Sequence, residues 1–282
     1  MIKSLSTVLT IGGSDPTCGA GIQADIRSIS VVGCHPLAVI TSITSQNSKG
    51  VQRVFALPPD LIFDQICSIQ EDVLPDSIKI GLLGSLDIAK EISQYLKDTQ
   101  PYIPVVVDPV ISSSAGGNML EKDTSRKKLL EKYIKDIFPY STVITPNYNE
   151  AKELVDIFKL GNSSDMNKEE MADLIATESK CFAVIIKGGH DNGENAEDLL
   201  FINEKKRVVD ISINKKQDCI NLHGTGCVYS SILASYLAFG NTLQESFKMT
   251  SAMMSGIISK SINYKLGAST YGPLNINKYI LK

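Results

Sequence analysis

The chain has 282 residues, and 43% of them are hydrophobic, which is enough for a substantial core. Charged residues make up 21% and cancel to a formal net charge of -3, so the composition argues against a nucleic-acid-binding protein or one held to anionic membranes. No apolar run reaches the roughly 18 residues of a membrane span, and the N-terminal MIKSLSTVLTIGG is too polar for the core of a signal peptide. We expect a cytoplasmic protein with one domain over residues 1–282.

The first two thirds of the chain alternate between two kinds of segment. Short apolar runs rich in β-branched residues occur at 7–13, 36–44, 78–84, 104–110, 142–147 and 182–189. Their apolar residues are nearly continuous, which is typical of strands buried on both faces. Apolar residues at helical spacing lie between them, for example Ile22, Ile26 and Ile29 before Gly33, and Ile88, Ile92 and Leu96 after a cap at Ser85. This alternation predicts a three-layer α/β/α fold with a mostly parallel sheet.

The last third departs from the alternation. The runs DLLFIN (198–203) and RVVDISI (207–213) are separated by a charged turn, which predicts an antiparallel hairpin at one edge of the sheet. Two helices follow in succession, at 224–239 and 243–264. The stretch 160–170 is expected to be a loop that leads into a helix capped near Asp165 or Asn167.

Polar residues and glycines gather where the predicted strands end. They are Gly12 to Asp15, Gln46 with Asn47, Gly81, Asp108, Asn147 with Glu150, and Lys187 to Gly189. One or two such placements are ordinary turn chemistry. Because ligands of open parallel sheets bind beyond the carboxyl ends of the strands, six of them predict the rim of an active site.

The segment HGTGC (223–227) precedes a helix that reads as apolar. Glycines at Gly224 and Gly226 leave backbone amides free, and the positive end of the helix dipole lies at the same point, so the amides of Gly224, Thr225, Gly226 and Cys227 predict an anion site. The alternative is a glycine-capped buried helix. A cysteine in the first helical turn favours the anion site, and we expect Cys227 to have a lowered pKa and to act as a thiolate on a hydroxyl.

Two carboxylates and an amine complete the candidate chemistry. Asp108 and Glu150 are hard oxygen ligands suited to Mg²⁺, and Lys187 is a cation for phosphate oxygens, a combination that phosphoryl transfer requires. Glu150 alone could instead be a helix-dipole partner. The segment GGSDPTCGAG (12–21) matches neither a P-loop nor GxGxxG, so we expect a substrate loop. Asp25, one turn into the next helix, would accept hydrogen bonds from an amino or hydroxyl group.

Several motifs resemble one family over nearly the whole chain. GGSDPTCGAGIQAD, the pair QN at Gln46, KIGLLG, VVVDPV, ITPNYNEA, IIKGGH and HGTGC occur in the same order in the hydroxymethylpyrimidine/phosphomethylpyrimidine kinases of thiamine biosynthesis, which are ribokinase-like proteins. The resemblance implies a ribokinase-like fold, a homodimer, and Mg²⁺-dependent transfer from ATP to a hydroxymethyl group on a pyrimidine and then to the monophosphate. GTGC also resembles bacterial pyridoxal kinases, so a pyridoxal/pyridoxine kinase is the alternative.

The resemblance also implies roles for individual residues. The pyrimidine would be held by Gly13, Asp25 and Gln46, with Leu82 and Val110 packed on its ring. Mg²⁺ and the ATP phosphates would be handled by Asp108, Asn147, Glu150 and Lys187. The amides from Gly224 to Cys227 would bind the transferred phosphoryl group, with the Cys227 side chain facing the substrate hydroxyl.

Four positions differ from the family pattern. Leu82 stands for a usual Met, and Cys18 stands for a usual Gly, which is costly if the loop needs a positive φ. Val228 stands for a common Thr and is expected to remove a hydroxyl from the anion site, and 112–117 lacks a basic residue.

Two other classes of function compete with a kinase. A catalytically silent sensor of phosphorylated pyrimidines would not need to keep Asp108, Glu150, Lys187 and Cys227 together. An NAD-dependent dehydrogenase is disfavoured because the chain lacks GxGxxG.

Overall fold

The computed structural model describes residues 5–47, 49–99, 103–110, 125–158, 166–189, 194–264, 266 and 272–280. Its centre is a nine-stranded sheet in the order β3-β2-β1-β4-β5-β6-β7-β8-β9. The strands are β1 (Thr7–Ser14), β2 (His35–Asn47), β3 (Gly50–Ala56), β4 (Ser77–Ile80), β5 (Val105–Val107), β6 (Val143–Ile144), β7 (Ala183–Ile186), β8 (Asn195–Ile202) and β9 (Arg207–Lys215). The run from β2 to β7 is parallel, which confirms the mostly parallel sheet.

Both edges of the sheet are antiparallel. The predicted hairpin at 198–213 is confirmed as β8 and β9, although β8 begins earlier, at Asn195. At the other edge, β3 pairs with β2, and this strand was not predicted. The sequence GVQRVFA mixes buried, part-buried and exposed residues without a regular order, because this edge strand has no continuous apolar cover on both faces.

Two strands run further than predicted. Strand β1 ends at Ser14, one residue after the predicted run 7–13, and β2 ends at Asn47, three residues after the predicted run 36–44. Ser14, Gln46 and Asn47 are therefore the last residues of their strands and do not follow them. The error moves none of them away from the carboxyl end of the sheet, where the predicted rim lies.

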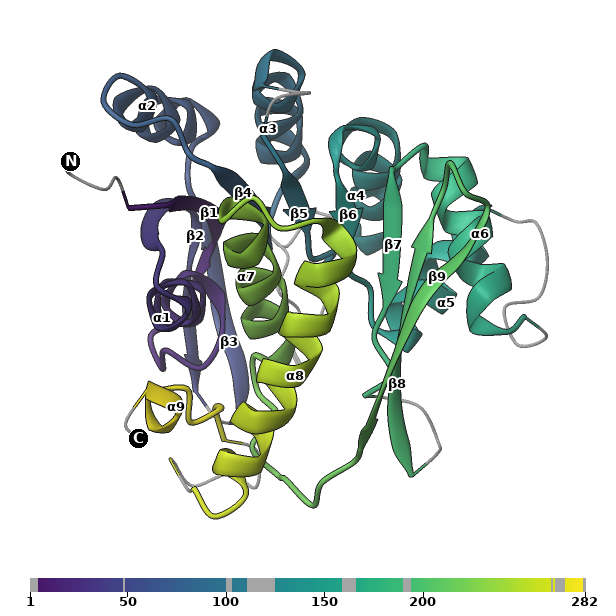
Figure 1. Ribbon diagram of the computed structural model, residues 1–282. Helices are drawn as coiled ribbons and strands as arrows, with labels where there is room; N and C mark the ends of the chain where they lie inside the picture. Colours follow the sequence, from purple (N-terminus) through teal and green to yellow (C-terminus); the bar gives the residue numbers. More distant parts are fainter. Residues whose placement is uncertain are drawn as a thin grey trace, which may run out of the picture.

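Helices cover both faces of the sheet, and Figure 1 views the molecule from the side of α1, α7 and α8. The face toward that viewer carries α1 (Gly21–Val32), α7 (Thr225–Ala238) and α8 (Leu243–Ser261), with the short α9 (Asn277–Ile280) beside α1 and α8. The opposite face carries α2 (Pro59–Gln70), α3 (Leu86–Thr99), α4 (Arg126–Lys132), η1 (Tyr133–Ile137), η2 (Phe138–Tyr140), α5 (Tyr148–Phe158) and α6 (Lys168–Ser179). Each face has its own apolar cluster, which confirms the three-layer α/β/α fold.

The ends of the helices follow the signals in the sequence. Gly33 ends α1 in the left-handed conformation, with φ of 105°, and Ser85 caps α3 through its Oγ, 3.2 Å from the amide of Ile88. Asn167 is the cap of α6 and forms a capping box with Glu170, so of the two candidates Asn167 is correct. Asp165 lies outside the described residues.

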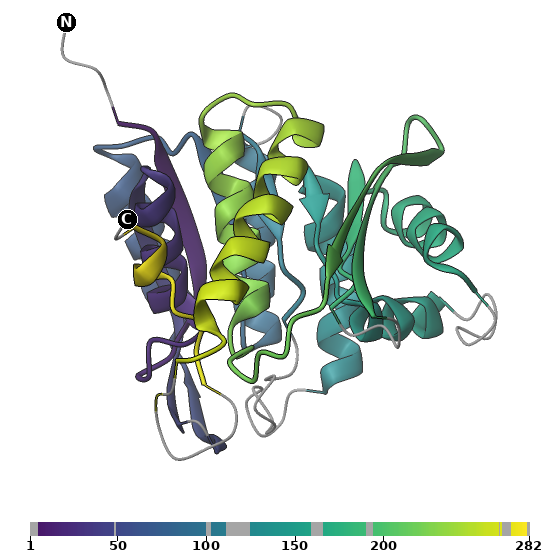
Figure 2. The same cartoon turned by 60° about the horizontal axis from the view of Figure 1, so that its bottom comes forward.

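Helix α7 is buried on nearly all sides. It lies between the sheet, α1 and α8, and Figure 2 shows α7 and α8 side by side on one face of the sheet. Ten of its residues are buried, from Cys227 to Leu237. Because the helix is fixed by neighbours along its length, its first turn is held at a defined place at the edge of the sheet.

Two further observations concern the whole chain. All six cysteines are described and all are free, as expected from their scattered positions. In the part of the chain that the structure describes, no helix is both long and apolar enough to cross a bilayer.

Candidate active site

A cavity of about 550 Å³ lies at the carboxyl ends of the parallel strands. The residues predicted for the site all line this cavity: Gly13, Asp25, Gln46, Leu82, Asp108, Val110, Asn147, Glu150, Lys187, Gly224, Thr225, Gly226 and Cys227. The fold therefore brings together residues from the whole length of the sequence. The start of α7 lines this cavity through Gly224, Thr225, Gly226 and Cys227.

The backbone at the start of α7 has the form that the glycines predict. Gly224 is the N-cap and has φ of 81°, and a Cβ there would overlap the carbonyl oxygen of Gly19, so no other residue fits. The first helical hydrogen bond runs from the amide of Val228 to Gly224. The amides of Gly226 and Cys227 have no backbone acceptor among the described residues. Together with the helix dipole they form an anion site in the cavity wall.

An acid and an amine lie directly over this anion site. The Nζ of Lys187 is 2.9 Å from Oδ1 of Asp108. Both residues are close to Gly226, since a Cβ built at Gly226 would lie 3.0 Å from Oδ2 of Asp108 and 3.4 Å from Nζ of Lys187. Burial lowers the pKa of Lys187, but the attraction of Asp108 and Glu150 outweighs burial and leaves the pKa above its ordinary value. Lys187 is therefore a permanent cation at the anion site.

Glu150 has the structural role that was the alternative, and it also lines the cavity. Its Oε2 accepts a hydrogen bond from the amide of Asn147 at 2.8 Å, while Oδ1 of Asn147 accepts from the amides of Asn149 and Glu150, so the two residues cap α5 reciprocally. Burial raises the pKa of Glu150 to about 7, with Lys187 opposing this rise and Asp108 adding to it. The carboxylate of Glu150 thus caps α5 and also lines the cavity.

The two carboxylates suit a magnesium ion that is shared with phosphate. The Oδ2 atom of Asp108 is buried and has no hydrogen-bond partner among the described residues, so it is an acceptor that a cation would satisfy. No group of three or more His, Cys, Asp or Glu side chains suited to a metal occurs among the described residues. The donor set therefore fits Mg²⁺ held by one or two carboxylates, water and phosphate oxygens, and it does not fit an ion held by protein alone.

The expected ionisation of Cys227 is wrong. The side chain is only 8% exposed, and burial raises its pKa to about 12, with Lys79 opposing and Asp25 and Asp108 adding to the rise. The sulfur accepts a hydrogen bond from the amide of Gly21, the first residue of α1. Loss of water around the sulfur outweighs the helix dipole, so Cys227 is a thiol at neutral pH.

The other end of the cavity has a mixed apolar and polar wall. Leu82 and Val110 belong to the apolar cluster under α2 and α3, and a Cβ at Gly13 would lie 2.7 Å from Oγ of Ser42, so this wall is closely packed. In the part of the chain that the structure describes, the buried Oε1 atom of Gln46 has no hydrogen-bond partner. The wall thus offers a flat ring two aliphatic contacts and one hydrogen-bond acceptor.

Asp15 connects this wall to the start of α7, a link that the sequence reasoning missed. Its carboxylate accepts hydrogen bonds from the amide of Ala20 at 2.9 Å and from Thr17, and it lies 3.2 Å from Nε2 of His223. Burial raises its pKa, but hydrogen bonds from His223, Gln46 and Thr17 outweigh burial and hold the pKa of Asp15 far below its usual value. Because Asp15 is an acceptor only, it orients the Gln46 amide nitrogen toward itself and leaves Oε1 for a ligand.

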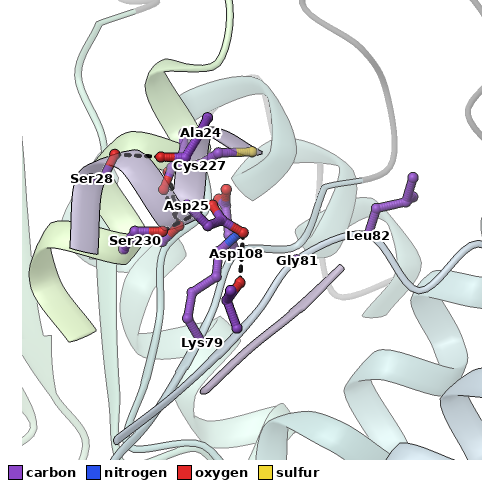
Figure 3. Close-up of polar contacts among 12 residues, drawn as sticks. Ala24, Asp25, Ser28, Lys79, Gly81, Leu82, Asp108, Cys227 and Ser230 are labelled. Atoms are coloured by element: carbon purple, nitrogen blue, oxygen red, sulfur yellow. Dashed lines mark hydrogen bonds and ion pairs between the residues drawn. The ribbon is translucent and has the colours of Figure 1, made fainter. Parts of the chain in front are cut away.

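Asp25 does not offer the free acceptor that was expected. Its carboxylate is fully buried and accepts from Lys79 at 2.9 and 2.8 Å, from Thr10 at 2.6 Å and from Ser231 at 2.9 Å. A carboxylate has about four lone-pair sites, so all of them are filled. Figure 3 shows Asp25 and Lys79 together beneath Cys227. Lys79 was missed, although a lysine inside the otherwise apolar strand SIKI is the signal that could have revealed it.

The positions that depart from the family pattern have different outcomes. Cys18 has φ of 58°, so the loop does use the conformation that favours glycine. Val228 is fully buried in the apolar cluster under α7 and does not line the cavity, so the expectation that it removes a hydroxyl from the anion site is wrong. The segment 112–117 lies outside the described residues.

These features define a class of protein. A ribokinase-like three-layer fold with a free helix start, a cation and two carboxylates around one cavity is a kinase of small molecules. A sequence model of the phosphomethylpyrimidine kinase family matches residues 15–275. The chain belongs to this family.

Individual relatives agree with this assignment. A hydroxymethylpyrimidine/phosphomethylpyrimidine kinase of Staphylococcus aureus (strain MSSA476) is 34% identical, over 100% of this chain and 97% of the relative. The crystal structure of phosphomethylpyrimidine kinase from Clostridium difficile 630 is 36% identical, with a TM-score of 0.72 over 92% of this chain and 100% of that chain. A Staphylococcus aureus pyridoxal kinase in complex with AMP-PCP and pyridoxal is 28% identical, with a TM-score of 0.80 over 98% of this chain and 95% of that chain. The predicted family and kinase class are confirmed.

Proposed function

We propose that the protein transfers the γ-phosphoryl group of ATP to the hydroxymethyl group of 4-amino-5-hydroxymethyl-2-methylpyrimidine and then to the resulting monophosphate, in thiamine biosynthesis. The observation that carries the proposal is the shared cavity of the α7 start, the Asp108–Lys187 pair and Gln46. Use of ATP is supported by the pyridoxal kinase relative, which was solved with AMP-PCP.

The phosphate end of the cavity acts mainly by fixed charge. The amides of Gly226 and Cys227 hold the transferred phosphoryl group, and Lys187 binds its oxygens. Donors arranged in this way contribute about 2.7–4 kcal/mol each to transition-state stabilisation. Mg²⁺, when held by Asp108 and Glu150 directly or through water, neutralises charge on the phosphates. Asn147 positions Glu150 through the reciprocal cap.

Cys227 contributes as a thiol. A loose transition state of phosphoryl transfer needs little removal of the proton before the new bond forms, so a thiolate base is not required. The thiol lies in the first turn of α7, beside the amides that bind the phosphoryl group, where it orients the attacking hydroxyl by a hydrogen bond. Its burial excludes water that would compete as acceptor.

The substrate end favours an aminopyrimidine. Gly13 allows the ring to approach the backbone, Leu82 and Val110 pack on its faces, and Gln46 turns its buried Oε1 to the cavity. An acceptor at this place matches the amino group next to the hydroxymethyl group of the pyrimidine. Asp25 supports this end from beneath the wall, through its bonds to Thr10 and Lys79.

A direct assay tests the proposal. ADP release should be measured with folded protein, ATP, Mg²⁺ and the hydroxymethylpyrimidine, and then with its monophosphate. We expect turnover with both acceptors. Absence of turnover above the rate of ATP hydrolysis alone would refute the proposal.

Pyridoxal is the second candidate substrate, because the overall fold has a TM-score of 0.80 with a pyridoxal kinase. We expect kcat/KM for the hydroxymethylpyrimidine to exceed that for pyridoxal, since an unpaired buried acceptor at Gln46 disfavours a ring without the amino group. The opposite order would assign the protein to pyridoxal.

We also propose that the protein works in the cytoplasm as a homodimer. The resemblance to the family suggests the dimer, and the β2–β3 edge carries an exposed apolar pair, Ile43 and Phe55, which are cross-strand neighbours and are each 53% exposed. Sedimentation equilibrium should give twice the mass of 30.6 kDa, and Phe55→Ser should shift it toward the monomer. A monomeric wild-type protein would contradict this part.

A further inference from the structure

Lys79 lies in the middle of a buried strand. The neighbours Ile78 and Ile80 point into the apolar cluster on the side of α2 and α3, whereas Ser77 donates to the carbonyl of Ala234 in α7 at 2.8 Å. Because side chains alternate along a strand, Lys79 points to the same side as Ser77, toward α1 and α7. Its side chain is 1% exposed.

The carboxylate of Asp25 is the centre of a network that joins four elements. Asp25 of α1 accepts from Lys79 of β4 through both carboxylate oxygens, and it also accepts from Thr10 of β1 and Ser231 of α7. Burial lowers the pKa of Lys79, but attraction to Asp25 and Asp108 outweighs burial and raises the pKa, so the ammonium stays charged. The third N–H of Lys79 has no acceptor among the described residues.

The fold does not need this charge for stability. A buried ion pair loses the hydration of both groups, and its replacement by apolar side chains of similar volume is often neutral or stabilising. Apolar residues also lie on this side of the sheet, where Val106 is the strand partner of Lys79 and Ala24 precedes Asp25. A charged pair kept at this place therefore calls for a role in the site above it.

The position of the network in the chain points to that role. Asp25 lies one helical turn after Gly21, whose amide donates to the sulfur of Cys227, and Ser231 lies one turn after Cys227 itself. On the strands, Lys79 lies two residues before Gly81, whose Cβ position is 2.8 Å from its Nζ. Asp25 and Lys79 thus lie in the wall of the cavity, and Ser231 lies one turn below the phosphoryl-binding start of α7.

We infer that Asp25 and Lys79 are positioning residues, which hold the starts of α1 and α7 at a fixed spacing through Thr10 and Ser231 so that the Cys227 thiol and the phosphoryl-binding amides meet the acceptor hydroxyl. They act through these backbone segments and not by contact with the substrate. The inference rests on one part of the proposed function, namely that phosphoryl transfer takes place at the start of α7.

A matched pair of serine variants in α7 tests the inference. Ser231→Ala removes one hydrogen bond to Asp25, and Ser235→Ala, one turn later, removes a hydrogen bond of 2.8 Å to the carbonyl of Ser231 that lies outside the network. Both serines are fully buried, so the loss of packing is the same. We expect Ser231→Ala to lower kcat about tenfold with little change in either KM, and Ser235→Ala to leave kcat unchanged.

A double variant separates positioning from stability. The double variant Asp25→Leu with Lys79→Met replaces the ion pair by two apolar side chains, so its thermal stability should be close to that of the wild type. Its kcat should be about 10²-fold lower than that of the wild type, because the network no longer fixes the helix starts. If the double variant does not fold, the serine pair still decides. Wild-type kcat in Ser231→Ala, or an equal loss in Ser235→Ala, would overturn the inference.

Amide exchange gives a readout that does not depend on the substrate. In unliganded protein, exchange at residues 21–24 and 224–228 should be faster in Ser231→Ala than in Ser235→Ala. If exchange differs between the two variants but the wild type does not turn over the pyrimidine, the proposed substrate is refuted and the positioning network still stands. The kcat values of the variants would then be measured with pyridoxal as substrate. Equal exchange in the two variants would contradict the network.

Discussion

Gly226 provides a test of the phosphoryl site that separates activity from stability. A Cβ at this position would lie 3.0 Å from Oδ2 of Asp108 and 3.4 Å from Nζ of Lys187, which is tighter than ordinary van der Waals contact. In Gly226→Ala, the side chains of Asp108 and Lys187 therefore have to move away from the start of α7 by a few tenths of an ångström. The added methyl group also lies where phosphate oxygens approach the amides. A displacement of this kind costs up to about 10²-fold in rate, or about 2.7 kcal/mol of transition-state stabilisation.

The same substitution should not harm the fold. Alanine in a helix is favoured over glycine by about 0.5–1 kcal/mol, and Gly226 lies inside the first turn of α7, where its φ is not in the left-handed region. We expect thermal denaturation to show an unchanged or slightly higher Tm, and the ADP-release assay to show kcat reduced about 10²-fold. A wild-type kcat/KM in Gly226→Ala would mean that phosphate does not approach this helix start, and the reasoning on the anion site would be refuted.

Other residues of the site give further predictions. Cys227→Ala should lower kcat by about 10²–10³, as expected when a positioned hydrogen-bond donor is lost. Because burial raises the pKa of Cys227 to about 12, alkylation of this residue in the wild type should be slow near neutral pH. Rapid alkylation near neutral pH would contradict the assignment of Cys227 as a thiol. Asp108→Asn should raise the Mg²⁺ concentration for half-maximal activity about 10–100-fold, and an unchanged Mg²⁺ titration would remove Asp108 from the metal site. The pKa of Glu150 is raised from 4.5 to about 7, so the folded state holds this proton more tightly than the unfolded state and loses stability as pH rises between these values. We therefore expect the Tm of Glu150→Gln minus the Tm of the wild type, both measured without metal, to increase as the pH rises over that range. A difference that does not depend on pH would contradict the raised pKa.

Much of the fold could be predicted because its signals are local. Continuous β-branched runs identify buried strands, and Gly33, Ser85 and Asn167 mark helix ends by the conformation or hydrogen bond that each supplies. The strand at 50–56 was missed for a local reason too, since an edge strand with mixed burial has neither a continuous apolar run nor a strict alternation.

The site could be predicted in its members but not in its electrostatics. Many residues of the cavity were predicted because strand ends and helix starts converge at one edge of a parallel sheet, whereas Lys79 inside a strand was not. The protonation of Cys227 was predicted wrongly, because its pKa depends on how much water the packing of α1 and α7 removes, and the sequence of the first turn does not carry that quantity. For the same reason the saturated carboxylate of Asp25 followed only from its partners Thr10, Lys79 and Ser231, which are distant along the chain.

The burial of α7 has a consequence for how the protein is made. This helix begins at Thr225, yet it packs against β1, β4 and β5, which are synthesised much earlier. A nascent chain that has emerged up to β9 exposes the apolar side of these strands and lacks the phosphoryl-binding loop altogether. Catalytic competence and shelter of that surface from aggregation are therefore acquired in one event, when the residues of α7 leave the ribosome.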